Sequence, residues 1–192
     1  MKKPIVNMIW LGSPLPQRYR KNIQSYIDNG YEVKLWTEPP KMYNKQLFDK
    51  IKTPAIKADI MRLEILYQNG GIYTDVDSFM NKELPILSDL MCTTSLSGYC
   101  ENSTLYATQG HPALKNAIQN VLKHYDAIND EIYVWEIAGA TFIDPIFSKY
   151  EHYKFTKDEV GSLHRKPIYI AHSFDGTWSN GNKSEKRKKE DW

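Results

Sequence analysis

Residues 66–77 of this chain read LYQNGGIYTDVD, and no other stretch is as informative about how the chain folds. It joins the end of a helical pattern to a short apolar strand through a glycine pair, which is typical of a helix stop. Side chains alternate along a strand, so we expect Tyr73, Asp75 and Asp77 to share one face where this strand ends. Two carboxylates placed there predict a site for Mg²⁺ or Mn²⁺ with positions open for a phosphorylated substrate, although a solvated turn is the alternative for so short a motif.

The helix before this strand carries a second charged pair. Residues 55–68 have apolar side chains at helical spacing, and Asp59 and Arg62 stand three residues apart beside that stripe. An ordinary surface ion pair is one interpretation. Because the glycine pair fastens this helix to the strand with Asp75 and Asp77, the alternative is a pocket for a nucleotide diphosphate, in which the pair holds sugar hydroxyls or phosphate oxygens.

Strand-like and helix-like segments alternate along the rest of the chain, which predicts an α/β fold. The 192 residues, 41% of them hydrophobic, suit one compact domain, expected over residues 1–182 and followed by a basic, flexible tail at 183–192. We expect strands at 4–10, 31–37, 71–77, 91–96, 104–108 and 168–172, and helices at 16–28, 45–51, 55–68, 112–124 and 137–150.

Composition narrows the classes of protein to consider. A formal net charge of +2 is too small to predict a polyanionic partner. Cys92 and Cys100 match no metal or redox spacing, and the amino terminus lacks a signal-peptide pattern, so we expect reduced thiols and a cytoplasmic protein. No apolar run reaches the roughly 18 residues of a transmembrane helix.

Several of these segments together resemble a known family. The strings ADIMR (58–62), LY (66–67) and GGIYTDVD (70–77) are similar to the signature of DXD-containing sugar transferases, a family that includes yeast α-mannosyltransferases, capsular polysaccharide glycosyltransferases and large clostridial glucosylating toxins. NMIWLG (7–12), YEVKLW (31–36) and GHP (110–112) resemble other segments of the same family. The resemblance covers residues 4–115 well and the remainder loosely.

The resemblance implies a GT-A fold, a Rossmann-like mixed sheet flanked by helices, in a metal-dependent glycosyltransferase. Such an enzyme moves a hexose from a UDP- or GDP-sugar to a glycan, a lipid-linked glycan or another hydroxyl acceptor, as in polysaccharide biosynthesis, usually with Mn²⁺ (Mg²⁺ remains open) and with retention of anomeric configuration. The implied catalytic residues are Asp59, Arg62, Asp75 and Asp77. The implied donor-binding residues are Trp10, Asp59, Arg62, Tyr73, Asp75 and Trp178, and the implied metal ligands are Asp75, Asp77 and His172.

Some of these roles have structural alternatives. Trp10 would stack on the nucleobase or close the first strand as a core aromatic, and Tyr73 would line the nucleotide pocket or pack in the core. His172 and Trp178 come from IAHSFDGTW (170–178), which resembles the family's closing H-x(n)-S-W element with Thr in place of the usual Ser. Residues 138–140 read AGA where relatives have T-G-P, which leaves donor identity open.

Other functions remain as alternatives. A calcium loop is disfavoured because the residues after Asp75 lack the glycine that an EF-hand requires, and a nuclease would need more acidic or histidine ligands. A non-catalytic module that binds sugar nucleotides is the rival from another class. The tail contains KSEKRKK (183–189), a solvated end in the simplest interpretation; contact with an anionic membrane or with nucleic acid, including transfer to modified DNA, is the functional alternative.

Overall fold

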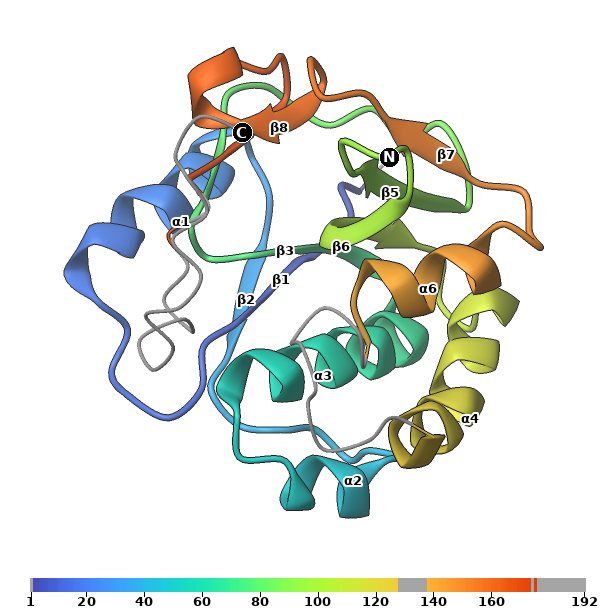
Figure 1. Ribbon diagram of the computed structural model, residues 1–192. Coiled ribbons are helices and arrows are strands. Elements are labelled where there is room, and N and C mark those ends of the chain that lie inside the picture. The colour runs from blue at the N-terminus through green and yellow to red at the C-terminus, as the bar shows by residue number, and fades with distance from the viewer. Residues whose placement is uncertain (1, 128–137, 174, 176–192) are drawn as a thin grey trace.

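The computed structural model describes residues 2–127, 138–173 and 175. Its centre is a six-stranded mixed sheet with helices on both faces (Figure 1), so the predicted α/β class is confirmed. The strands in spatial order are β2 (Val33–Trp36), β1 (Val6–Ile9), β3 (Gly71–Thr74), β6 (Cys100–Ala107), β5 (Leu90–Thr94) and β7 (Tyr153–Phe155).

The first three strands of this sheet run parallel, and their carboxyl ends therefore meet at one edge. β1 pairs in parallel with β2 and with β3, whereas β6 is antiparallel to both β3 and β5. In parallel α/β sheets the strand carboxyl ends are where ligands bind. Trp10, which follows β1, and Asp75, which follows β3, leave the sheet at this edge.

Two hydrophobic clusters cover the two faces of the sheet. On one face lie α2 (Lys45–Lys50), α3 (Pro54–Asn69), α4 (Pro112–Ala127) and α6 (Ala140–Phe147), gathered on one side in Figure 1. The other face is covered by α1 (Arg20–Asp28), which follows a 3₁₀ turn at Gln17–Tyr19. Within the described residues, no helix is long and apolar enough to span a membrane.

A three-stranded sheet, which the sequence analysis did not foresee, completes the fold. It consists of β4 (Ser78–Met80), β9 (Ile170–His172) and β8 (Val160–Ser162), with β9 antiparallel to β4 and parallel to β8. A 3₁₀ turn at Leu163–Arg165 follows β8. Of these strands only β9 was predicted, as part of the strand expected at 168–172; β4 and β8 show no alternating pattern of their own.

The glycine pair between α3 and β3 performs the turn that the sequence predicted. Gly70 has φ of 65° and Gly71 has φ of 99°, a region that residues with a Cβ rarely adopt. A Cβ on Gly71 would also collide with the carbonyl oxygen of Ile5, and one on Gly70 would lie 2.8 Å from the backbone nitrogen of Gln109. Gly71 therefore allows close packing against the residue before β1, and Gly70 allows it against the segment after β6.

Candidate donor and metal site

The two aspartates of the DXD sequence lie in a turn and not along a strand. β3 ends at Thr74, and the backbone nitrogen of Ser78 donates to the carbonyl oxygen of Asp75 over 3.1 Å. The prediction that strand alternation sets Tyr73, Asp75 and Asp77 on one face was therefore wrong in its mechanism. The turn folds the chain back into β4 and brings the two carboxylates together by another route.

His172 joins this pair from the far end of the chain. In β9 it pairs with Ser78 of β4, directly after the turn. Its Nε2 lies 3.2 Å from a carboxylate oxygen of Asp75 and 3.2 Å from one of Asp77. One ligand atom from each of the three residues falls within 4.8 Å of the others. The three residues proposed as metal ligands are thus neighbours, and two carboxylates with an imidazole form a donor set suited to Mn²⁺ or Mg²⁺.

The charges of this trio compensate one another. Burial acts to lower the pKa of His172, but Asp75 and Asp77 outweigh it, so the pKa lies above its ordinary value. For Asp75, burial acts to raise the pKa, yet Arg62 and His172 lower it overall; for Asp77, burial prevails and the pKa is raised. When it is protonated, His172 supplies the two carboxylates with part of the positive charge that a divalent cation would supply.

Asp59 and Arg62 form a buried pair that points to the same edge. Their side chains are only 9% and 6% exposed, and Arg62 Nη2 lies 2.7 Å from Asp59 Oδ1. The surface ion pair considered above is therefore excluded. The same nitrogen lies 3.5 Å from Asp75 Oδ1, which links the helix pair to the metal trio. The sequence reasoning that α3 and the following turn would share one site is supported by this contact.

The buried pair has an asymmetric electrostatic balance. Burial raises the pKa of Asp59 to about 6, with Arg62 as the main opposing influence, so the carboxylate is mostly ionised at neutral pH. Burial also acts to lower the pKa of Arg62, but Tyr73 and the nearby aspartates raise it overall. Arg62 is a permanent cation that keeps Asp59 usable as an acceptor of hydrogen bonds from hydroxyl groups.

Tyr73 serves both as a core residue and as a member of the site. Its ring is buried in the larger hydrophobic cluster, and the guanidinium of Arg62 lies 4.3 Å from the ring centroid. Its hydroxyl donates to Asp75 Oδ1 over 2.7 Å. The ring of Tyr73 therefore packs in the core while its hydroxyl orients a carboxylate, and its place in a nucleotide pocket stays a prediction.

Asn102 is a site residue that sequence reasoning missed. Its side-chain amide donates to Asp59 Oδ1 and to the carbonyl oxygen of Ala138, both over 3.0 Å. The backbone carbonyl oxygen of Asn102 accepts a hydrogen bond from Arg62 Nη1 over 2.6 Å. The register of β5 against β6 shifts between Cys92 and Thr93, so residues 102–104 bulge from that pairing. No local sequence pattern marks this bulge, which is why Asn102 carried no signal.

The chain after His172 closes over Asp77. The hydroxyl of Ser173 donates to the backbone carbonyl of Asp77 over 3.0 Å, and the backbone nitrogen of Asp175 donates to its carboxylate over 2.9 Å. Asp175 also accepts from Tyr19 over 2.8 Å. The ring of Tyr19 lies 5.4 Å from that of Trp10, so a chain of contacts joins Trp10 to Asp77.

Trp10 and Trp178 differ in what the structure says about them. Trp10 is partly buried at the end of β1, and its indole nitrogen donates to Ser13 Oγ over 3.2 Å. This position is compatible with stacking on a base as well as with packing against the core. Trp178 and the tail at 183–192 lie outside the described residues, so both remain predictions.

Comparison with known proteins agrees with the predicted resemblance. The family described as "Glycosyltransferase sugar-binding region containing DXD motif" matches residues 16–96. Inositol phosphoceramide mannosyltransferase 1 of Schizosaccharomyces pombe is 25% identical over 187 residues, which cover 88% of this chain and 50% of that protein. Mannosyl phosphorylinositol ceramide synthase SUR1 of Saccharomyces cerevisiae is 26% identical over 186 residues, covering 88% and 48%. The chain spans about half the length of these curated relatives.

Solved structures agree on the fold. PaToxG glycosyltransferase superposes with a TM-score of 0.61 at 18% identity, covering 77% of this chain and 70% of that one. A glycosyltransferase involved in glycosylation of the major capsid of PBCV-1 superposes with a TM-score of 0.53 at 15% identity, covering 88% and 93%. The sequence and fold comparisons together confirm the prediction: this chain is a relative of the DXD-motif glycosyltransferases and has a GT-A fold.

Proposed function

We propose that this protein is a metal-dependent hexosyltransferase that uses a nucleotide-diphosphate sugar and retains the anomeric configuration. The observation that carries the proposal is the single network joining Asp59, Arg62, Asp75, Asp77 and His172 at the carboxyl edge of the parallel strands. The relatives named as mannosyltransferases support the reaction class. The domain would extend over residues 1–182.

The donor set supports a hard divalent cation, with Mn²⁺ first and Mg²⁺ as the alternative. Asp75, Asp77 and His172 would hold it, and the ion would supply positive charge to the diphosphate of the donor. His172 must lose its proton to act as a ligand, so cation binding and proton release are coupled. The closing contacts from Ser173 and Asp175 would keep the Asp77 carboxylate in place.

The helix pair would hold the donor's sugar. Asp59 accepts hydrogen bonds from hydroxyl groups, and Arg62 fixes the carboxylate against the strand edge. Asn102 completes this part of the site, since one residue contacts both members of the pair. It also donates to the carbonyl oxygen of Ala138, and residues 138–140 would form the floor of the sugar site. Trp10 would stack on the base, and Trp178 would contact the donor diphosphate.

Transfer requires the diphosphate to leave, so the main contribution of the site is electrostatic. Arg62 and the cation site together place positive charge next to the developing negative charge of the leaving group. Within the described residues, every carboxylate of the site is engaged by Arg62, His172 or Tyr73. Because these carboxylates already have partners, we assign none of them the role of base for the acceptor hydroxyl. The arrangement therefore favours front-face attack, in which the departing phosphate oxygen accepts the proton of that hydroxyl.

The names of the relatives are what suggests a class of acceptor. One is named as an inositol phosphoceramide mannosyltransferase and the other as a mannosyl phosphorylinositol ceramide synthase, so a mannosyl donor and an inositol-containing lipid are the first substrates to assay. A glycan, a lipid-linked glycan or modified DNA remain alternative acceptors. The basic tail would bring the enzyme to an anionic membrane surface if the acceptor is a lipid.

The test is release of nucleoside diphosphate from a panel of UDP- and GDP-sugars, measured with and without Mn²⁺. We expect turnover of one donor that requires the cation and falls by at least about 10²-fold in Asp77→Asn, because a cation ligand is lost. Asp49→Asn is the matched control, since Asp49 is an exposed residue of α2. Donor binding without turnover under every condition would favour the non-catalytic module instead.

A further inference from the structure

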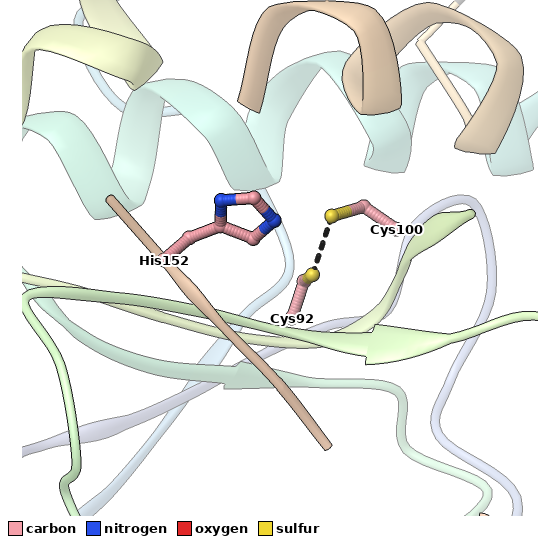
Figure 2. A group of neighbouring side chains, drawn as sticks. All are labelled: Cys92, Cys100 and His152. Carbon is pink, nitrogen blue, oxygen red and sulfur yellow. Dashed lines mark hydrogen bonds between the residues drawn. The ribbon is translucent and has the colours of Figure 1, made fainter. Parts of the chain in front are cut away.

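Outside the candidate site, the two cysteines of the chain meet in the core. Cys92 of β5 and Cys100 of β6 are fully buried, and their sulfurs lie 2.6 Å apart (Figure 2). The shifted register pairs Cys100 with Thr94, which lies two residues after Cys92 on the same face of β5. The cysteines are therefore diagonal neighbours across two strands, a relation that their sequence spacing did not reveal.

The distance between the sulfurs discriminates among possible roles. Unbonded carbon atoms rest about 3.5–4.0 Å apart, and sulfur is larger, so two independent thiols would lie farther apart than these. Two sulfurs bound tetrahedrally to one zinc ion at about 2.3 Å would lie about 3.8 Å apart. A disulfide requires about 2.05 Å. The observed separation of 2.6 Å is closest to the disulfide length, so the two sulfurs need less movement to form an S–S bond than to reach either of the other arrangements.

His152 is positioned to serve the thiol pair as a base. Its Nδ1 lies 2.8 Å from the carbonyl oxygen of Tyr150, which can only accept, so the neutral ring carries its proton on Nδ1. The other ring nitrogen faces the sulfurs in Figure 2, and one ring nitrogen lies within 4.8 Å of both. The hydrogen bond that Cys92 donates to Cys100 raises the pKa of Cys92, and burial raises it further, so a base is needed to form a thiolate.

We propose that Cys92 and Cys100 are a modification site, oxidised by peroxide to a reversible disulfide with His152 as proton acceptor. His152 takes the proton of one thiol, and the thiolate attacks a peroxide oxygen to give a sulfenic acid while the departing hydroxide becomes water. The second sulfur then displaces the hydroxyl group and closes the S–S bond, releasing a second water. In sum, two thiols and one hydrogen peroxide give one disulfide and two waters, and a thiol reductant reverses the bond.

The bond would close a short loop that contains the turn between β5 and β6. Ser95 and Tyr99 are already joined there by a backbone hydrogen bond of 2.8 Å. A link closing nine residues stabilises the folded state mainly by restricting the unfolded chain. For a chain of this size we expect the melting temperature to rise by about 5–10 °C on oxidation.

The experiment compares peroxide-treated and reduced full-length protein. After the peroxide is removed, each sample is denatured and treated with iodoacetamide, and its intact mass is measured. Because the chain contains only these two cysteines, the number of alkyl groups reports directly on the pair. We expect two groups on reduced protein, none on oxidised protein and two again after reductant, with the rise in melting temperature gained and lost in step.

Variants separate the disulfide from other oxidation. Cys100→Ser and Cys92→Ser should each lose the temperature response, although methionine oxidation remains possible in both. His152→Gln should form the same bond more slowly, and an unchanged rate would overturn the role of His152. Two reactive thiols after peroxide, or oxygen added to a single cysteine, would overturn the disulfide. One zinc ion per chain that co-purifies with the protein and is lost in His152→Gln would show that the two cysteines and His152 form a metal site and not a disulfide.

Discussion

The buried pair of Asp59 and Arg62 gives the sharpest test of the site's electrostatics. Replacing Arg62 by methionine keeps much of the side-chain volume but removes the charge. Asp59 would then remain buried, and among the described residues the Asn102 amide would be its one hydrogen-bond donor. Breaking a buried ion pair by removing one partner costs about 3–5 kcal/mol. For a chain of this length that corresponds to a fall in melting temperature of about 6–20 °C.

The pH dependence of this loss distinguishes a stranded charge from a packing defect. Burial already raises the pKa of Asp59 to about 6, and Arg62 is the main influence that lowers it. A carboxyl group with a raised folded-state pKa destabilises the fold when ionised, and this penalty disappears as the pH falls through the folded pKa. The cost of Arg62→Met should therefore be full near pH 8 and shrink towards pH 5, where Asp59 becomes protonated.

The assay is urea unfolding at both pH values, followed by circular dichroism. Lys45→Met is the matched control, because Lys45 pairs with Asp49 on an exposed helix surface, where such pairs contribute about 0.3–0.5 kcal/mol. The double variant Asp59→Leu with Arg62→Met should recover part of the loss, since no charge of the pair is then buried alone. A cost below about 1 kcal/mol, or one that does not vary with pH, would refute the reasoning.

Three further predictions concern the same region. Mn²⁺ affinity, measured by thermal shift, should fall as the pH drops through the raised pKa of His172, because a histidine that binds a cation must be neutral. The stability of the cation-free protein should show the opposite trend: the contribution from protonated His172 is full below about pH 6.5 and is lost as the pH rises through the raised pKa. Gly71→Ala should lower the free energy of unfolding by more than about 1 kcal/mol, because φ of 99° and the Ile5 carbonyl both oppose a Cβ; equal stability by urea titration would contradict this. Asn102→Leu should raise the KM for donor more than about tenfold while the unfolding midpoint changes less than in Arg62→Met, and an unchanged KM would remove Asn102 from the site.

The elements that the sequence predicted well are those whose signals are local. The helix expected at 55–68 is α3 at Pro54–Asn69, and the glycine pair stops it where expected. Burial of that helix was underestimated. Helices and sheet cover nearly all its faces, so Asp59, Arg62 and Glu64 are buried as well as the apolar stripe. Glu64 is satisfied there by the backbone nitrogens of Tyr43 and Asn44, partners that no helical pattern could indicate.

The short strands show the limit of local reasoning. β4, β7 and β8 have three residues each, too few for an alternating pattern to be recognised. Each becomes a strand because a partner supplies its hydrogen bonds, as β5 does for β7. The helix expected at 137–150 is shorter, Ala140–Phe147, and tolerates Pro145 inside it. The short strands come from tertiary pairing, which overrides weak local preference.

The same division explains the candidate site. Asp75 and Asp77 could be identified from the motif together with the helix and glycine pair before it, but two groups that contact this network come from distant segments of the chain. His172 arrives only because β9 pairs with β4 in a register that sets it opposite Ser78. Asn102 arrives only because the β5–β6 register shifts. The two carboxylates, Arg62 and Tyr73 are thus specified locally, whereas His172 and Asn102 join the network through strand pairing. A substitution that shifts the β4–β9 register should therefore weaken cation binding even with every ligand residue intact, since one step of register turns His172 to the opposite face.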